Sequence, residues 1–588
     1  MPKKVVLFFL TTFFYFFSII AQANDDNLWS FLLHYKNNTF NIDDPNFYVK
    51  GIPSSLSEER QRTLTLLSEI TPESKSFVCQ FPARFKFIKN HHPLIKNAWH
   101  DYPLQTCSDY ATYNARVPVD NIYLVFAAEN ISSPTSMMGH VFIRLEGENA
   151  NSDPLNHAFS YFAIINSFNP LLLVTESLIT GQEGRFSLMP YHEALFNYTE
   201  REGRSVWEYQ LDASEETKQL IKDHLFELKD IRPSYYFTKY NCATVLYDII
   251  TLIEPELNSK RNEHKWITPR DLVKDIIELD VIKSKTIYIN PIQGMKWLKW
   301  EVSNEVKTLR PEHFLEERAY LKSLAEKSIY NHLYINYLND YYFSKNEISK
   351  QTLEQVKAEI PRLDDHFHSY QTSPEKAPND SQYSLGVKKI NNTNSLNLSI
   401  LPASHKIMDS SAAFFTENAL ELGEIELALY ENDVKLEQLT LYTVKNINSV
   451  DPHAHNLSWG WGAHFDRNNP TNLERTLGLN LEFGIGKSID LQKNLLIYNL
   501  NYLGARADFK SQLPFFRLEV GSIYNLSNIF KVHLEGHRNW TNGYSSTEKK
   551  LLISYGNSAK ARFVGSAGRK GVNDKFETTI ELKLVNYF

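Results

Sequence analysis

The sequence predicts a multidomain α+β protein that ends in an antiparallel β-barrel of about 10 to 12 strands. Three observations support this prediction. The chain begins with an apolar stretch typical of exported proteins. Its middle part alternates between strand-like and helix-like hydrophobic periods, as α+β domains do. From about residue 386 to the end the period becomes two, which indicates long antiparallel strands.

The first 23 residues have the pattern of a secretory signal peptide. Lys3 and Lys4 precede an apolar run from Val5 to Ile20, and Ala21-Gln22-Ala23 is a small-x-small cleavage site. An uncleaved membrane anchor is the alternative, although the run is short for a membrane span. We therefore expect cleavage near Ala23 and a location in the periplasm and outer membrane of a Gram-negative-type cell envelope.

Charge and composition exclude some classes of function. The formal net charge is −7 and no basic block stands out, which argues against a nucleic-acid partner. We find no glycine-rich phosphate loop and no zinc-ligand spacing, so we expect neither a cofactor nor a metal. His453 and His455 lie in a turn between alternating segments and are interpreted as loop residues.

The hydrophobic pattern divides the exported chain into four parts. We expect a small N-terminal domain at 24–115, a domain with candidate catalytic residues at 116–270, a helical segment with a linker at 271–385, and the β-barrel at 386–588. Within the second part, strands are expected at 122–127, 137–145, 157–163 and 205–211, and helices at 214–229 and 241–252.

The C-terminal part contains segments of roughly ten residues that alternate apolar and polar positions, and the chain ends on Phe588. This is the pattern of outer-membrane barrels. A periplasmic β-sandwich, whose strands also alternate, stays open as an alternative. Asn586 departs from the barrel pattern, because the third residue from the end of such barrels is usually aromatic or apolar.

The chain has three cysteines: Cys79, Cys107 and Cys242. In an oxidising compartment cysteines tend to form disulfide bonds in pairs, so an odd number leaves one cysteine free. We pair Cys79 with Cys107, which lie 28 residues apart in a loop-rich stretch and leave Cys242 free. The two other pairings, of Cys242 with Cys79 or with Cys107, remain open here. Each would place Cys242 in a disulfide bond.

Cys242 is the candidate nucleophile. Asn241 is a good N-cap residue, and the apolar residues after Cys242 recur at helical spacing, so the cysteine falls in the first turn of a helix. The helix dipole and free amides at this position favour a thiolate with a low pKa, and they can also stabilise an oxyanion. The alternative is a small hydrophobic residue packed beneath a helix start.

A thiol enzyme needs a base within hydrogen-bond reach and a third group that orients the base. His140, on an expected strand edge, is the candidate base. The following strand offers His157, Ser160 and Tyr161 as the third group, and we favour His157, with Tyr161 in a supporting role. Arg144, on the strand face of His140, is expected either to bind an anionic substrate group or to face solvent.

These residues, in their order along the chain, resemble a known family. Gly139-His140, Ser160-Tyr161, Gly181 and Gly184, Trp207-Glu-Tyr209 and Tyr240-Asn241-Cys242 look like the periplasmic domain of the Lnb-type lipoprotein N-acyltransferases, a bacterial domain also called DUF4105. The resemblance covers about 118–270. The order of histidine before cysteine also resembles that of circularly permuted NlpC/P60 papain-like thiol enzymes.

The resemblance implies a cysteine-dependent acyltransferase. Cys242 would attack an acyl ester of a lipoprotein or phospholipid with His140 as base, and the acyl thioester would then pass to an amino terminus. The resemblance implies no cofactor, and it implies lipid substrates at the outer membrane. Two other functions stay open: a papain-like thiol hydrolase, either peptidase or amidase, in the periplasm, and a non-enzymatic outer-membrane binding or assembly protein.

Overall fold

The computed structural model describes residues 27–131, 137–165, 172, 175–363, 374–411, 414, 416–451, 453, 457–469, 473–509, 512–541, 543–557 and 560–588. The predicted signal peptide, the middle of the predicted linker (364–373) and His455 lie outside these residues. The chain forms two compact units. The first comprises the described parts of 1–127, 139–198 and 206–286, and the second those of 128–138, 199–205 and 287–588.

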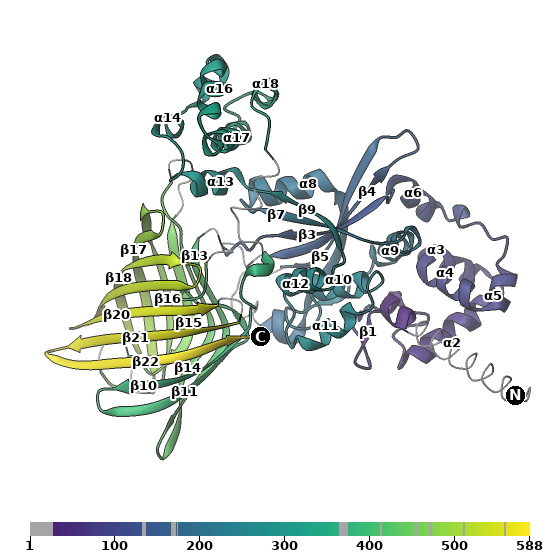
Figure 1. The fold of residues 1–588 in the computed structure, drawn as a ribbon. Helices are drawn as coiled ribbons and strands as arrows, with labels where there is room; N and C mark the ends of the chain where they lie inside the picture. Colours follow the sequence, from purple (N-terminus) through teal and green to yellow (C-terminus); the bar gives the residue numbers. More distant parts are fainter. Residues whose placement is uncertain are drawn as a thin grey trace, which may run out of the picture. The chain divides into compact units, whose positions relative to one another are not determined.

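A seven-stranded sheet forms the centre of the first unit, in the order β8-β6-β5-β4-β3-β7-β9 (Figure 1). The pairings from β8 to β7 are antiparallel. The strands are β3 (Asn121–Ala127), β4 (His140–Glu148), β5 (Pro154–Ile164), β6 (Gln182–Pro190), β7 (Val206–Leu211), β8 (Ser234–Tyr235) and β9 (Ile282–Tyr288). This order places β4, which begins at His140, in the middle of the sheet.

Helices cover both faces of this sheet: α8 (Tyr191–Phe196), α9 (Glu215–Leu228), α10 (Cys242–Ile250), α11 (Leu257–Glu263) and α12 (Pro269–Glu278). Side chains alternate along β4, so His140, Phe142 and Arg144 share one face. The Tyr191 ring of α8 lies 6.4 Å from the Phe142 ring, which places α8 on this face. Helix α10 contacts β4 and β5 from the opposite face (Figure 1).

The first unit also contains the predicted small N-terminal domain. It has a two-stranded hairpin, β1 (Tyr35–Lys36) and β2 (Thr39–Phe40), and the helices α2 (Leu56–Leu67), α3 (Pro72–Gln80), α4 (Pro82–His91), α5 (Pro93–Ala98) and α6 (Ser108–Arg116). Cys79 and Cys107 are bonded, with Cα atoms 5.2 Å apart, and Cys242 is free and buried. The predicted disulfide is therefore confirmed.

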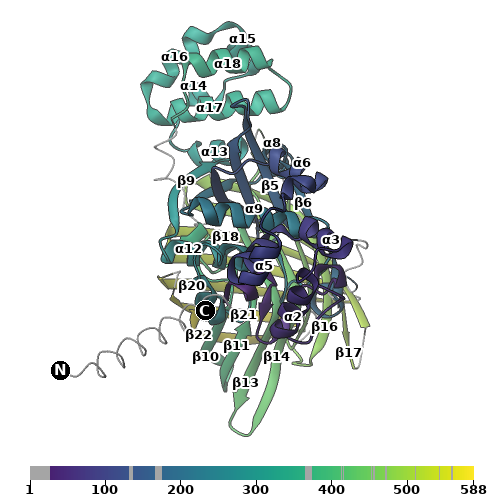
Figure 2. The ribbon, with the colours of Figure 1, turned by 90° about the vertical axis from the view of Figure 1, so that its right-hand side faces the viewer.

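The second unit begins with a group of helices: α13 (Pro291–Leu298), α14 (Asn304–Lys307), α15 (Pro311–Glu316), α16 (Arg318–Lys327), α17 (Ile329–Ser344) and α18 (Lys350–Glu359). Figure 2 shows α14 to α18 gathered in one bundle, whose core contains Val306, Phe314, Leu324 and Leu338. Among the described residues, no helix is long and apolar enough to cross a membrane.

The predicted helical segment is not helical throughout. Residues 282–288 form β9 at the edge of the sheet, where we expected helix. The alternation of Ile282, Ser284, Thr286 and Tyr288 with lysines and isoleucine is weak, and an edge strand needs only one paired neighbour. The same weakness explains why β6 and β8 were not predicted.

The C-terminal part is a closed antiparallel β-barrel. Its strands are β10 (Gln382–Ile390), β11 (Thr393–Leu401), β12 (Ala403–His405), β13 (Glu417–Tyr430), β14 (Asp433–Ile447), β15 (Ser458–Asp466), β16 (Gly478–Gln492), β17 (Leu495–Asp508), β18 (Gln512–Ser527), β19 (Phe530–Thr541), β20 (Tyr544–Asn557), β21 (Ala561–Val572) and β22 (Lys575–Tyr587). Pairing of β10 with β22, and of β11 with β13, closes the ring.

Strand β12 continues the line of β11 after Pro402 and pairs with the next part of β13, so twelve strands surround the barrel. This agrees with the predicted number. The β-sandwich alternative is wrong, because every strand of the ring has two hydrogen-bonded neighbours and the sheet has no free edge.

The polarity of the barrel is the reverse of that of a water-soluble protein. Large apolar side chains such as Phe483, Ile580 and Leu582 point outward and are about half exposed. The interior contains ion pairs, among them Lys583 with Glu426 at 2.8 Å. An apolar outer band around a polar interior is the arrangement that a lipid bilayer requires of a barrel. The barrel is thus of the outer-membrane type.

Candidate active site

Cys242 occupies the first helical position of α10. Asn241 is the N-cap, and its side chain accepts a hydrogen bond from the Thr244 amide at 3.0 Å. The Thr244 hydroxyl in turn accepts a hydrogen bond from the Asn241 amide at 2.7 Å, which completes a capping box. Asn241 therefore has the supporting role in the helix start that the sequence predicted, and it holds the cysteine at the amino end of α10.

Polar groups around the Cys242 thiol favour its ionised form. They are the backbone amide of Val141, the hydroxyl of Tyr235 and the backbone amide of Ala243, which belongs to the first turn of α10. The side chain itself is only 4% exposed. The environment of the sulfur is therefore dry but rich in hydrogen-bond donors.

The prediction of a low thiol pKa is not met. Burial raises the pKa of the Cys242 thiol, and the amide of Val141 and the hydroxyl of Tyr235 only partly oppose this effect. The helix dipole was expected to dominate, but desolvation of a buried anion costs more than a helix end provides. The thiol is thus protonated at neutral pH, and chemistry at this sulfur requires a base.

The Val141 amide, which favours the ionised form of the Cys242 thiol, follows His140 directly in β4, so the sulfur lies near the backbone of the strand start. The His140 ring packs 6.0 Å from the Phe142 ring and 6.1 Å from the Tyr198 ring. These ring contacts place the His140 side chain on the α8 face of the sheet, whereas Cys242 begins α10, which packs against the opposite face.

Gly139 makes this end of β4 possible. Its φ is +84°, and a Cβ atom there would lie 2.8 Å from the Phe126 ring. Because only glycine fits such a backbone beside a ring, β4 begins at His140 and not at Met137, as the sequence had suggested. The turn at Gly139 thus makes His140 the first residue of the central strand β4.

The register does not bring His157 to His140. His157 pairs with Leu145, five residues after His140 in β4, and paired residues share a face, whereas His140 lies on the other face. Burial lowers the pKa of His157, and its Nδ1 has no hydrogen-bond partner among the described residues. His157 is therefore not placed as the group that orients the base.

Arg144 is held inside the domain. Its guanidinium donates to Glu208 at 2.6 Å and to Asn156 at 3.0 Å, and it lies between the rings of Tyr123 and Tyr191, at 4.5 and 4.7 Å. These contacts use both edges and both faces of the guanidinium. Arg144 supports the sheet face beneath His140, and it neither faces solvent nor is available to bind an anionic substrate group.

Three tyrosines surround the sulfur on the α10 side. The Tyr161 ring lies 5.3 Å from the Tyr235 ring and 5.5 Å from the Tyr240 ring. The Tyr161 hydroxyl donates to the carbonyl of Pro233 at 3.1 Å, close against Gly184, where a Cβ atom would lie 2.2 Å from that hydroxyl. Burial raises the pKa of Tyr235, so its hydroxyl stays protonated and donates to the sulfur.

Sequence reasoning missed a buried polar network behind the cysteine. His34 lies with its Nδ1 3.0 Å from the Tyr240 hydroxyl and 3.2 Å from a carboxylate oxygen of Asp248, a residue of α10. Its Nε2 is 3.0 Å from Nε2 of His224. Arg261 forms an ion pair with Asp248. His34 is distant in sequence and follows a short helix at 27–32, so no local pattern pointed to it.

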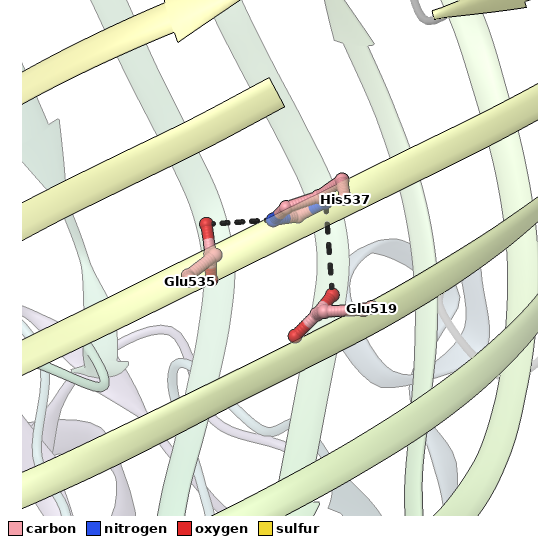
Figure 3. A group of neighbouring side chains, drawn as sticks. All are labelled: Glu519, Glu535 and His537. Atoms are coloured by element: carbon pink, nitrogen blue, oxygen red, sulfur yellow. Dashed lines mark ion pairs between the residues drawn. The ribbon is translucent and has the colours of Figure 1, made fainter. Parts of the chain in front are cut away.

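One carboxylate–histidine cluster inside the barrel has the composition of a metal site: Glu519, Glu535 and His537 (Figure 3). The Lys445 ammonium lies 2.5 Å from Glu519 and 3.8 Å from Glu535. Since a lysine already supplies the positive charge between these carboxylates, the cluster is an ion-pair network of the barrel interior.

Comparison with known proteins assigns the part of the chain that contains Cys242. Residues 109–278 match the family model described as the Lnb N-terminal periplasmic domain. This segment is similar to Lnb N-terminal periplasmic domains. Its match spans His140, Tyr235 and Cys242. Together with the outer-membrane-type barrel, an Lnb periplasmic domain supports a location at the periplasm and outer membrane.

Two further family models match outside the Lnb domain, and both are described as domains of unknown function: DUF7843 at 21–91 and DUF7840 at 371–563. The DUF7843 segment contains His34, and its polar residues are buried against those of the Lnb domain within one compact unit. Among curated proteins, none matches the chain.

The chain is also similar to solved outer-membrane proteins. NanC porin is 12% identical, with 35% of this chain and 99% of the porin covered and a TM-score of 0.24. OmpT of Vibrio cholerae, in a form lacking loop L8, is 12% identical over 35% and 97%, with a TM-score of 0.22. An outer membrane channel from Pseudomonas putida F1 is 12% identical over 39% and 100%, with a TM-score of 0.25.

Proposed function

We propose that the protein is a cysteine-dependent acyltransferase that acts on acyl esters of lipoproteins or phospholipids. The observation that carries this proposal is a free, buried Cys242 at the start of α10, where the Val141 and Ala243 amides and the Tyr235 hydroxyl favour the ionised thiol. A free cysteine that served only packing would need no such groups around it. The same proposal includes a papain-like arrangement, in which the cysteine lies at a helix start and the histidine lies on a strand.

The chemistry proceeds in two balanced steps. His140 takes the proton of the Cys242 thiol as the sulfur attacks the ester carbonyl, and the protonated histidine then gives that proton to the departing alcohol. The products are an acyl thioester on Cys242 and a lyso lipid. An amine then attacks the thioester carbonyl, the C–S bond breaks, and the sulfur recovers a proton.

The environment of the sulfur favours the first step. Amides at a helix start stabilise the oxyanion of a tetrahedral intermediate when they point at it before the reaction begins. The raised thiol pKa means that proton transfer to His140 must accompany attack. This requires a His140 ring nitrogen within hydrogen-bond reach of the sulfur in the substrate complex, at roughly 3 Å.

The dryness of the site favours transfer over hydrolysis. Cys242 is almost completely buried, and Tyr161 and Tyr235 lie near it. A thioester in such a site meets little water, so an amine that docks there is the better acceptor. A periplasmic thiol hydrolase that uses the same two residues is the second candidate function. Access of water to the acyl carbon of the thioester would favour this hydrolase.

Substitution of the two residues tests the proposal. Full-length protein in detergent is incubated with a diacylglyceryl lipopeptide and an amine acceptor, and N-acylated product is measured. We expect Cys242→Ala to abolish turnover and His140→Ala to lower it by about 10² to 10⁴-fold. His192→Ala, an exposed histidine of α8, is the matched control and should retain activity.

The same assay separates the alternatives. Release of free fatty acid or of cleaved peptide, with no N-acylated product, would favour the hydrolase. Full activity of Cys242→Ala would leave only a function without thiol chemistry, such as binding or assembly at the outer membrane.

A further inference from the structure

The second unit contains a cavity of about 310 Å³ at one end of the barrel, beside α13. Its walls come from α13, from the turns that join β16 to β17 and β18 to β19, and from residues just before β13. The antiparallel register places these turns at the end where the chain enters β10 and leaves β22. This is also the end at which the periplasmic part of the chain is attached.

The cavity has an excess of positive charge. Its lining includes five cationic side chains, Lys296, Lys299, Lys493, Lys531 and Arg562, and two carboxylates, Asp490 and Glu417. Both carboxylates already form ion pairs with lysines of the lining. Glu417 pairs with Lys531 at 2.8 Å, and Asp490 pairs with Lys299.

Arg562 is the most unusual of these residues. Its side chain is 1% exposed, and it donates to the Ser554 hydroxyl at 2.7 Å and to the Asn528 carbonyl at 3.5 Å. Within the described ranges, no carboxylate forms an ion pair with it. A buried guanidinium whose partners are all neutral is strongly unfavourable, since burial removes water without supplying a counter-charge. Its position in the cavity wall indicates that an anion supplies this charge.

Lys296 repeats this feature on the opposite wall. Its amine donates to the Asn448 side chain at 2.9 Å and, in the part of the chain that the structure describes, forms no ion pair. Burial lowers the pKa of Lys296, an effect that a bound anion would reverse. Two cations that form no direct ion pair among the described residues, one from α13 and one from β21, thus line the same cavity.

The apolar part of the lining indicates where the anion comes from. Trp297, Trp300 and Leu495 border the cavity, and Trp300 is 41% exposed. Tryptophan is the residue that membrane proteins place at the level of lipid headgroups. A cationic cavity with tryptophans at its rim fits a phosphate that is joined to a lipid better than a free ion.

We propose that this cavity binds a phosphate group, carried by the headgroup of a membrane phospholipid. Arg562 binds the phosphate with the guanidinium N–H groups that Ser554 and Asn528 do not use, and Lys296 supplies a second charge-assisted hydrogen bond. The site lies in the second unit and does not depend on thiol chemistry at Cys242.

Ligand titration of the full-length protein in non-ionic detergent tests this site. The probes are glycerophosphoglycerol, which is a lipid headgroup without acyl chains, inorganic phosphate, and glycerol as the uncharged comparison. Binding is followed by calorimetry and by tryptophan fluorescence at constant ionic strength. We expect saturable binding of glycerophosphoglycerol, weakened about tenfold or more by Lys296→Gln and by Arg562→Gln. Arg538→Gln, an exposed arginine outside the cavity, is the matched control and should bind as the wild type does.

Each outcome decides the proposal. Stronger binding of glycerophosphoglycerol than of inorganic phosphate supports the headgroup, whereas binding of inorganic phosphate alone overturns it in favour of a free ion. No saturable binding of either probe, or binding that neither substitution weakens, overturns the site itself. If Arg562→Gln does not fold, as judged by circular dichroism, Lys296→Gln carries the test, because α13 lies outside the barrel strands.

Discussion

The backbone amide of Val141 lies near the thiol of Cys242 and favours its ionised form. This relationship joins the central strand β4 to the start of α10. Val141 follows His140 in β4, but neighbouring side chains of a strand point to opposite faces, so the proposed reaction requires the His140 ring to reach the sulfur around the start of the strand.

Removal of the Tyr235 hydroxyl should make the thiol harder to ionise. The hydroxyl stabilises the thiolate, so in Tyr235→Phe the thiol pKa, already raised by burial, should rise further. Ultraviolet absorbance of the thiolate as a function of pH measures this shift. In the transfer assay, activity should fall with no change in circular dichroism.

Tyr161→Phe is the matched control for that experiment. The Tyr161 hydroxyl donates to the Pro233 carbonyl and not to the sulfur, so its loss should cost about 1 kcal/mol of stability. The thiol titration should stay as in the wild type. Equal shifts of the thiol pKa in both variants would mean that general burial, and not the Tyr235 hydrogen bond, controls the sulfur.

Asp248 should determine part of the stability of the first unit in acid. Burial alone would raise the pKa of Asp248, but the Arg261 guanidinium and the His34 ring hold it below its usual value. A carboxylate with a lowered folded-state pKa contributes stability above its unfolded pKa, near 4, and loses it as the pH falls through the folded value. Wild-type stability should therefore fall below about pH 4.

In Asp248→Asn this part of the acid dependence should disappear. At pH 7 the variant should be less stable by about 3 to 5 kcal/mol, because Arg261 is left as a buried charge without its partner. Denaturant unfolding between pH 3 and 7 measures both effects. A variant that keeps the acid slope of the wild type would show that other carboxylates cause it.

The Cys79–Cys107 bond should stabilise the N-terminal helices. It closes a loop with a sequence separation of 28, for which loop entropy predicts about 3 to 4 kcal/mol. The double substitution Cys79→Ala and Cys107→Ala should lower the free energy of unfolding by this amount. As an independent check, alkylation of the unfolded, unreduced protein should modify Cys242 alone; modification of Cys79 or Cys107 would contradict the pairing.

The outward face of the barrel should tolerate charge only near its ends. Phe483 lies in the middle of β16 and is 52% exposed in the absence of lipid. Phe483→Arg should destabilise the barrel in bilayers by about 2 to 4 kcal/mol, whereas Val434→Arg, beside the turn between β13 and β14, should cost at most about 1 kcal/mol. Urea unfolding from lipid vesicles measures the difference. Equal, small effects would indicate a barrel surface that faces water.

Local patterns in the sequence predicted the elements with strong periodicity. The alternation of β3, β5, β7 and the barrel strands, and the helical spacing after Asn241, were each readable from neighbouring residues. The cysteine at the helix start, its N-cap and the disulfide followed in the same way. Strand β8 was missed because its two residues are too few to show a period, and β9 was missed because its alternation is weak.

The parts of the site that were not predicted depend on contacts between residues far apart in the chain. Tyr235 meets Cys242 only because β8 pairs with β6 at the edge of the sheet, and His34 reaches Tyr240 across 206 residues. His157 was favoured because it follows His140 on the next strand, but the register of β4 and β5 places it on the other face. The raised thiol pKa follows from burial, which no local pattern predicts.

Mass spectrometry of the peptide that contains Cys242 tests the central proposal most directly. The full-length protein is incubated with a diacylglyceryl lipopeptide, without an amine acceptor, and quenched in acid. The proposal predicts one acyl chain on Cys242, released by hydroxylamine, and none in Cys242→Ala. Formation of acylated product by a wild-type protein that never shows this thioester, or by Cys242→Ala itself, would contradict it.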